Sequence, residues 1–239
     1  MRRTIAAWAV HLLTASGAIW GLLALDSVAR DDARWALLWM ALAMAVDSFD
    51  GMLARAVGVK KVLPGFDGTL LDATLDYLNY AVVPAYFVWR MELVPVTLGL
   101  PMAAAILLAS AYQFCQAGAK TSDHFFKGFP SFWNVAVFYL FFARIDGRAN
   151  MAILVILCVG VFVPLKWAYP SRMLEMRTLT MSVTMLWGAS VVAMLIQYPD
   201  PASWLFWLSL SYVGFYAAVS VYLTQNAARR AFAARRDRA

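Results

Sequence analysis

The chain has 239 residues, of which 63% are apolar or aromatic and only 14% are charged, and its formal net charge is +6. Soluble globular domains contain about a quarter charged residues, so this composition excludes a disordered chain and favours a polytopic membrane protein. So few charges also exclude a basic nucleic-acid-binding domain, and we expect no nucleic-acid partner.

Apolar stretches long enough to cross about 30 Å of hydrocarbon recur along the chain. The first follows Arg2 and Arg3. It is about 20 residues long, which is more than a signal peptide needs, so we predict an uncleaved span. We predict eight helices, at residues 5–25, 34–57, 66–90, 94–117, 130–145, 149–168, 179–197 and 203–225. The predicted fold class is all-α: a polytopic integral membrane bundle of about eight transmembrane helices, with one membrane domain over residues 1–239.

The distribution of Lys and Arg predicts the orientation of these helices. With eight spans both termini lie on one side, and 15 of the 20 basic residues fall in the termini, the even-numbered loops and the adjoining helix ends. Cytoplasmic segments contain an excess of Lys and Arg, so we predict cytoplasmic N- and C-termini. The basic tail at residues 226–239 is then expected to lie against anionic lipid.

Acidic residues cluster where the second and third predicted helices meet. Residues spaced by three and four positions share one face of a helix. One face of helix 34–57 contains Asp47, Asp50, Gly51 and Ala54. One face of helix 66–90 contains Gly68, Asp72 and Asp76. Residues 56–67 include Lys, Pro and Gly residues that suit a cytoplasmic turn. The two faces are therefore expected to meet near the cytoplasmic surface.

Each charged carboxylate at membrane depth costs roughly 2.5–3.5 kcal/mol, so the negative charge of four of them must be neutralised. Protonation, pairing with Arg55 or binding of two divalent cations could neutralise it, and oxygen ligands suit Mg²⁺ or Mn²⁺. The planar guanidinium group of Arg55 can also bind two phosphate oxygens at once. Together with the carboxylates and the small residues, it indicates an enzyme that transfers a phosphoryl group at a pair of metal ions. Two simpler interpretations remain: the small residues could serve helix packing, and Arg55 could be a positive-inside anchor.

The pattern DxxDGxxAR followed by GxxxDxxxD resembles the signature of the CDP-alcohol phosphotransferases. All eight fixed positions are present within residues 47–76. The twelve residues between Arg55 and Gly68 form a longer gap than most of that family has. This gap, the eight spans and the length resemble the bacterial phosphatidylcholine synthase branch, as do the stretches FKGFPSFWN at 126–134 and YPSR at 169–172.

The resemblance implies an enzyme of the bacterial inner membrane that transfers the phosphatidyl group of CDP-diacylglycerol to choline and releases CMP near the cytoplasmic face. It also implies a homodimer and two divalent cations, with Mn²⁺ preferred and Mg²⁺ as the alternative. The implied metal ligands are Asp47, Asp50, Asp72 and Asp76, and Asp76 is also the implied base for the choline hydroxyl. The implied CDP-binding residues are Gly51, Ala54, Arg55 and Gly68.

A quaternary ammonium such as choline is recognised by aromatic faces. We select aromatic residues near the cytoplasmic ends of helices or on the Asp76 face: Tyr80, Phe129, Trp133, Trp167 and Tyr169. Three basic residues near the loop before helix 179–197 could guide the pyrophosphate, although positive-inside anchoring explains them equally well: Lys166, Arg172 and Arg177.

Four further residues are given structural interpretations. His11 lies inside the first span and is predicted to make a satisfied polar contact. Asp67 lies off the Asp72 face and is left out of the metal site. Cys115 and Cys158 lie in separate apolar runs and are predicted to be buried apolar side chains instead of disulfide or zinc ligands.

Two rival functions remain open. Another enzyme of the same family could use glycerol phosphate, inositol phosphate or serine as the acceptor. A cation transporter could use the Asp cluster as its ion site, because intramembrane acids also mark ion pathways. Transporter sites usually lie near the midplane between repeats, whereas these Asp are predicted near the cytoplasmic surface and no repeat is visible in the sequence.

Overall fold

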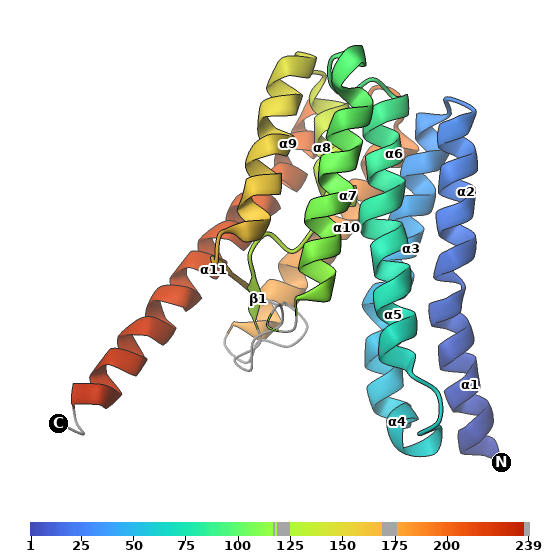
Figure 1. Cartoon of the computed structure of the whole chain (residues 1–239), viewed down its shortest axis with the longest axis vertical. Helices are drawn as coiled ribbons and strands as arrows, with labels where there is room; N and C mark the ends of the chain where they lie inside the picture. Colours follow the sequence, from blue (N-terminus) through green and yellow to red (C-terminus); the bar gives the residue numbers. More distant parts are fainter. Residues whose placement is uncertain (117, 119–124, 169–175, 237–239) are drawn as a thin grey trace. The chain divides into compact units, whose positions relative to one another are not determined.

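The computed structural model of the chain describes residues 1–116, 118, 125–168 and 176–236. These residues form two compact units: unit 1 is Met1–Phe114 with Ser131–Ile156, and unit 2 is Cys115–Pro130 with Leu157–Ala239. Helices occur in all eight predicted ranges (Figure 1). Among the described residues, five stretches are long and apolar enough to cross a bilayer: Arg2–Ala29, Ala33–Val57, Val96–Cys115, Thr178–Ile196 and Ser203–Gln225. The protein is therefore a helical, multi-pass membrane protein.

The first predicted span is longer than expected and is divided in two. Helix α1 (Arg2–Ala15) is followed by α2 (Gly17–Ala29), with only Ser16 between them. The Ser16 hydroxyl donates to the Leu13 carbonyl at 2.6 Å and accepts from Trp20 Nε1 at 3.1 Å. The backbone ladder continues across Ser16, whose N–H donates to the Leu12 carbonyl at 2.9 Å, so the two helices follow one another in one apolar stretch, Arg2–Ala29.

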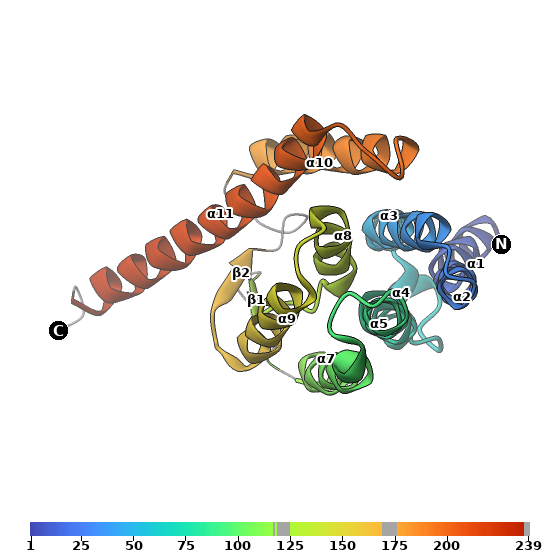
Figure 2. The same ribbon diagram turned by 90° about the horizontal axis from the view of Figure 1, so that it is seen from above.

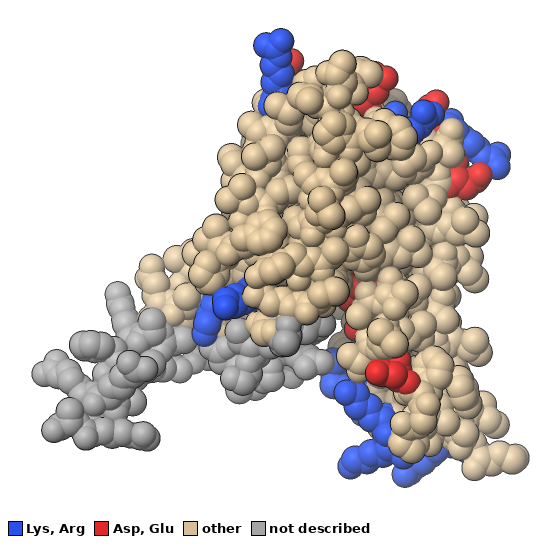
Figure 3. Space-filling view, viewed as in Figure 1, with Lys and Arg blue, Asp and Glu red and all other residues tan. Residues whose placement is uncertain are grey.

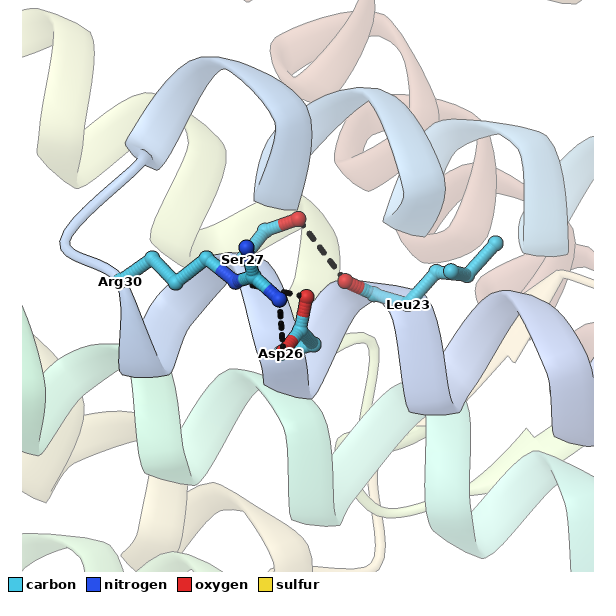
Figure 4. Close-up of polar contacts among 4 residues, drawn as sticks. All are labelled: Leu23, Asp26, Ser27 and Arg30. Atoms are coloured by element: carbon cyan, nitrogen blue, oxygen red, sulfur yellow. Dashed lines mark hydrogen bonds and ion pairs between the residues drawn. The ribbon is translucent and has the colours of Figure 1, made fainter.

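The link between α2 and α3 (Ala33–Val57) is organised by short-range polar contacts. Arg30 Nε pairs with Asp26 Oδ2 at 3.0 Å, and the Ser27 hydroxyl donates to the Leu23 carbonyl at 2.8 Å (Figure 4). Asp32 then caps α3 by accepting the Trp35 N–H at 3.1 Å. The Asp32 carboxylate thereby satisfies an N–H group at the start of α3 that has no intrahelical partner.

Helix α3 confirms the predicted helix 34–57 to within one residue. It ends at Gly58, whose φ of 72° lies in the left-handed region that glycine adopts without strain. A single turn, α4 (Val59–Val62), follows before the chain reverses. The turn predicted between the two acidic helices is thus present, with a short helix inside it.

The third predicted span is an unbroken helical run of three pieces: α5 (Gly68–Tyr77), the π-helical turn η1 (Leu78–Val82) and α6 (Val83–Arg90). It begins two residues later than predicted because Asp67 is the N-cap of α5. The Asp67 carboxylate accepts the N–H groups of Thr69 and Leu70, both at 3.0 Å. The π-helical turn was not predicted.

Unit 1 contains four further helical pieces. They are the 3₁₀ turn η2 (Val96–Leu98), α7 (Gly99–Cys115), α8 (Trp133–Ala143) and the first part of α9 (Gly147–Phe162). Seen along the helices, α5 lies between α7 on one side and α2 and α3 on the other (Figure 2). The Tyr77 hydroxyl bonds α5 to α7 by donating to the Leu107 carbonyl at 3.1 Å.

Unit 2 contains the end of α9, two short strands and two long helices. Strands β1 (Phe125–Lys127) and β2 (Lys166–Ala168) pair antiparallel, with Phe126 opposite Trp167. Helices α10 (Arg177–Ile196) and α11 (Ser203–Arg236) pack side by side (Figure 2). Helix α11 extends beyond the predicted residue 225 into the basic tail.

Three expectations about this part of the chain are wrong. The helix predicted over 149–168 stops at Phe162, because the residue before Pro164 is disfavoured in the helical region, and Lys166–Ala168 forms a strand. Cys115 is exposed and Cys158 is only partly buried. An apolar run at membrane depth faces lipid as readily as protein, so it does not predict burial inside the protein.

Charged side chains divide between the two ends of unit 1. Figure 3 shows Lys and Arg gathered at the end that contains α4, whereas acidic and basic side chains are mixed at the end where α2 joins α3. The segments at the α4 end contain Arg2, Arg3, Arg55, Lys60 and Lys61. The basic excess predicted for one side of the membrane therefore gathers at one end of this unit.

Candidate active site

Helices α3 and α5 bring three of the predicted metal ligands together. Asp47, Asp50 and Asp72 each offer a carboxylate oxygen, and these three oxygens lie within 4.8 Å of one another. Asp50 is only 3% exposed, and the other two are half-buried. Carboxylates this close repel one another unless a cation or a proton lies between them. Hard oxygen donors at this spacing fit a divalent cation such as Mg²⁺ or Mn²⁺.

The fourth predicted carboxylate lies in the same pocket. The pocket is lined by residues of α1, α2, α3, α5 and η1: Thr14, Gly17, Ala43, Val46, Asp47, Asp50, Asp72, Leu75, Asp76, Asn79 and Tyr80. Asp76 follows Asp72 by one turn of α5 and is half-buried. Helix α1 packs against both α3 and α5, and the Thr14 hydroxyl lies beside the Asp50 carboxylate. The two acidic faces predicted from the sequence therefore meet around one pocket.

Among the predicted aromatic residues that the structure describes, Tyr80 is the one that lines this pocket. Its side chain is 7% exposed, and its hydroxyl donates to Asp47 Oδ2 at 2.7 Å. Its ring is tilted by 52° against Phe132, with 6.0 Å between the ring centres. The prediction placed Tyr80 near the acidic face correctly, but it did not foresee the hydrogen bond to a metal-ligand candidate.

The predicted CDP-binding residues of α3 have two different surroundings. A Cβ atom built on Gly51 would lie 3.3 Å from Arg55 Nη1, so the exposed Arg55 guanidinium lies over the glycine. Ala54 is half-buried and packs against the apolar cluster of Ala7, Val10 and Val59. The structure therefore gives Ala54 a helix-packing contact and places an arginine over the partly exposed backbone at Gly51.

Gly68 is covered by a residue that sequence reasoning placed elsewhere. A Cβ atom built on Gly68 would lie 2.6 Å from Cε1 of His11, so the imidazole fills the space that was expected to admit cytidine. His11 is 6% exposed, and its ring centre lies 4.4 Å from that of Phe66. The expectation of a satisfied histidine is wrong for Nε2, which is buried and has no hydrogen-bond partner among the described residues.

The other choline and phosphate candidates lie in several places. Trp133, in unit 1, is fully buried and donates its indole N–H to the Ser110 hydroxyl at 2.7 Å. Phe129 and Trp167 lie in unit 2, where Trp167 stacks on Tyr216 at 5.7 Å. Lys166 Nζ lies 5.4 Å from the centre of the Phe125 ring. Tyr169, Arg172 and the Arg177 side chain lie outside the described parts of the chain.

Two polar pocket residues were missed by sequence reasoning. Thr14 lies on α1, and Asn79 lies on η1. Asn79 is buried, and its Nδ2 donates to the carbonyls of Gly17 and Leu75, both at 3.1 Å. The available signal was an amide inside an apolar stretch, because polar side chains at membrane depth usually have a specific partner. Asp67 lies outside the three-carboxylate cluster and is the N-cap of α5.

Comparison with known proteins gives one consistent result. No protein-family model matches the chain. Among curated proteins, a phosphatidylcholine synthase of Legionella pneumophila is 42% identical over 231 residues, which are 94% of this chain and 91% of the relative. Phosphatidylcholine synthases of Pseudomonas aeruginosa and Borreliella burgdorferi are both 37% identical, over 81% and 76% of this chain and 81% and 78% of the relatives. On this similarity over nearly its whole length, the chain belongs to the phosphatidylcholine synthase family.

Proposed function

We propose that the protein catalyses transfer of the phosphatidyl group from CDP-diacylglycerol to choline, giving phosphatidylcholine and CMP. The observation behind this proposal is the meeting of the signature carboxylates of α3 and α5 around one pocket, in a chain of the phosphatidylcholine synthase family. The signature itself resembles that of the CDP-alcohol phosphotransferases, to which we assign the chain.

The carboxylates would hold two divalent cations, with Mn²⁺ preferred over Mg²⁺. The oxygens of Asp47, Asp50 and Asp72 are close enough to share one ion, and Asp76 completes the donor set for a pair. Divalent cations bound here would neutralise the pyrophosphate and stabilise the departing CMP. Four carboxylates in a half-buried pocket supply the matching negative charge.

The substrate is held by the residues next to the carboxylates. The Arg55 guanidinium binds the pyrophosphate, and the bare backbone at Gly51 lets the CDP group approach α3 closely. Ala54 and Gly68 shape the neighbouring surface through their contacts with α1 and His11. The acyl chains remain in the bilayer, so only the head group enters the pocket.

Asp76 acts as the general base. It accepts the proton of the choline hydroxyl while the choline oxygen forms a bond to the lipid-linked phosphorus. The bond between that phosphorus and the bridging oxygen breaks, and the electron pair leaves with CMP. The position of Asp76 one turn after Asp72, on the same pocket wall, supports this assignment.

Choline binding is assigned to aromatic faces, because the quaternary nitrogen offers no hydrogen-bond donor. The ring of Tyr80 lines the pocket. Phe129, Trp133, Trp167 and Tyr169 are the remaining candidates. Lys166, Arg172 and Arg177 are assigned to guiding the pyrophosphate. We place the active site at the cytoplasmic face of the bacterial inner membrane, with both termini on that side, and we propose a homodimer.

The test is reconstitution of the purified protein with CDP-diacylglycerol, Mn²⁺ and labelled choline. We expect labelled phosphatidylcholine and CMP in equal amounts, and loss of both on chelation. CMP release with glycerol phosphate, inositol phosphate or serine, but not with choline, would support a CDP-alcohol phosphotransferase and would show that choline is not its acceptor. Cation flux into liposomes without CMP release from any acceptor would replace the enzyme by a transporter.

A further inference from the structure

The helix that contains Asp72 and Asp76 changes its hydrogen-bonding pattern directly after them. Residues Leu78–Val82 form the π-helical turn η1 between α5 and α6. Such turns appear mostly as single wide turns inside α-helices and are frequent at functional sites. The middle of this turn, Asn79, Tyr80 and Ala81, is buried. A wider turn changes the direction in which the following side chains point, so it redirects Tyr80 relative to a regular helix.

Asn79 fastens the turn to α2. Its Nδ2 donates to the Gly17 carbonyl at 3.1 Å, across 62 positions of sequence, and to the Leu75 carbonyl at the same distance. On the other side of the amide, a Cβ atom built on Gly21 would lie 2.8 Å from Asn79 Oδ1 and 2.9 Å from Leu78 Cδ2. Only a residue without a side chain lets α2 approach this closely. The Asn79 amide therefore lies between Gly17 and Gly21 of α2 on one side and the Leu75 carbonyl of its own helix on the other.

Tyr80 uses this fixed position to reach across the pocket to α3. Its hydroxyl donates to Asp47 Oδ2 at 2.7 Å, and the residue is 7% exposed. Hydrogen bonds to a carboxylate are about twice as strong as those between neutral groups, and a buried one fixes the rotamer of the acceptor. Asp47 also belongs to the three carboxylates whose oxygens lie within 4.8 Å of one another. One hydroxyl therefore controls the orientation of a cation-ligand candidate.

We propose that Tyr80 is a positioning residue for the metal site, whose hydroxyl fixes the Asp47 carboxylate, and that the π-helical turn clamped by Asn79 holds that hydroxyl in place. The proposal rests on the proposed function, because it assumes that Asp47 binds a divalent cation. It assigns the Tyr80 hydroxyl to the ligand shell, separately from any contact of its ring with choline. Hydrogen-bond partners of metal ligands typically affect affinity or activity by about 10–100-fold.

The test compares Mn²⁺ binding to purified wild-type protein and to Tyr80→Phe, without lipid substrate or choline, by electron paramagnetic resonance of free Mn²⁺. We expect the dissociation constant for Mn²⁺ to rise about 10-fold in Tyr80→Phe, because the ring stays and only the hydroxyl is lost. The matched control is Tyr77→Phe, which removes another tyrosine hydroxyl from the same helical run. The Tyr77 hydroxyl donates to the Leu107 carbonyl and not to Asp47. The Mn²⁺ affinity of Tyr77→Phe should equal that of the wild-type protein.

Turnover adds a second readout. In Tyr80→Phe the Mn²⁺ concentration for half-maximal rate should rise by the same factor, while the KM for choline at saturating Mn²⁺ stays that of the wild-type protein. Unchanged Mn²⁺ affinity, or a change confined to the choline KM, would overturn the positioning role and leave the proposed reaction intact. A wild-type protein that turns over CDP-diacylglycerol without binding Mn²⁺ or Mg²⁺ would overturn the metal assignment itself.

A second variant tests the clamp. Asn79→Leu keeps the approximate volume but loses both bonds, to Gly17 and to Leu75. We expect it to weaken Mn²⁺ binding about 3-fold or more, because Tyr80 is then held less firmly. Wild-type Mn²⁺ affinity in a folded Asn79→Leu protein would show that the turn does not hold the hydroxyl.

Discussion

At the turn between α2 and α3, Asp26 pairs with Arg30 and Asp32 caps a helix, whereas deeper in the same unit Asp47, Asp50 and Asp72 face one another. In the first region Asp26 and Asp32 have partners within four residues, and Asp31 lies 3.4 Å from Arg90. The Asp26 and Arg30 side chains are 52% and 74% exposed. In the second region the acids come from two helices, and Asp50 is 3% exposed. Identical side chains therefore make local pairing and capping contacts at the turn and form a cluster of like charges in the pocket.

The different surroundings of the two groups of acids indicate which of them is the better candidate for a functional site. A solvated ion pair contributes about 0–1 kcal/mol and is easily replaced. A group of buried carboxylates is costly unless a cation or proton joins them, so the fold retains it for binding or catalysis. The following variants test whether the two regions differ as strongly in function as they do in geometry.

The largest effect is expected for Asp50→Asn in the pocket. Loss of one carboxylate from the cluster should lower the rate of CMP release by more than about 100-fold, because even partners of metal ligands affect activity by 10–100-fold. The amide keeps the size of the side chain, so folding should be retained. The measurement is CMP release at saturating Mn²⁺, with chromatographic elution as the folding check. A variant with more than a tenth of wild-type activity would remove Asp50 from the metal site.

Gly68→Ala is expected to have the next largest effect. Both α3 and α5 start with a capping Asp followed by a small residue, Ala33 in one and Gly68 in the other. A methyl group at Gly68 would meet His11 Cε1 at 2.6 Å. Overpacking of this kind costs about 1–3 kcal/mol, so we expect a lower unfolding temperature. The double variant with His11→Ala should recover part of that loss, and additive losses would show that the two residues do not interact.

Arg55→Lys compares the arginine over Gly51 with the arginine of the α2–α3 turn. A lysine keeps the charge but loses the planar fork that binds two phosphate oxygens. We expect the KM for CDP-diacylglycerol to rise about 10-fold, or about 1.4 kcal/mol. The control is Arg30→Lys, which keeps a positive charge beside Asp26 and should leave the KM unchanged. An equal KM in both variants would support the positive-inside interpretation of Arg55.

The smallest effect is expected for Asp26→Asn. This change removes an exposed ion pair between two residues that lie one helical turn apart. The free energy of unfolding should therefore fall by less than about 0.5 kcal/mol. CMP release should equal that of the wild-type protein. A loss of activity comparable with that of Asp50→Asn would erase the proposed contrast between the two regions.

Local sequence signals predicted the acidic faces well. The spacing of Asp47 and Asp50, and of Asp72 and Asp76, placed all four carboxylates on helix faces that do meet at one pocket. Helix α3 was predicted to within one residue, and it ends where Gly58 adopts the left-handed conformation. These features depend only on residues a few positions apart.

Features that depend on distant contacts were not predicted. The π-helical turn is held by the bond from Asn79 to Gly17, and the covering of Gly68 depends on His11 in another helix. Neither partner can be chosen from spacing along the chain. The strand at Lys166–Ala168 was also missed, because its pairing with Phe125–Lys127 joins segments about 40 residues apart.

The two glycines of α2 have a consequence for protein engineering. Gly17 and Gly21 lie outside the eight-residue signature, yet their bare backbone is what lets Asn79 fit against α2. A designer who grafts residues 47–76 onto an unrelated helical scaffold would transfer the metal-ligand candidates without Asn79 and without the α2 glycines against which it packs. The segment to transplant is therefore the whole of α1 to α6, which contains both the acidic residues and the glycines of α2.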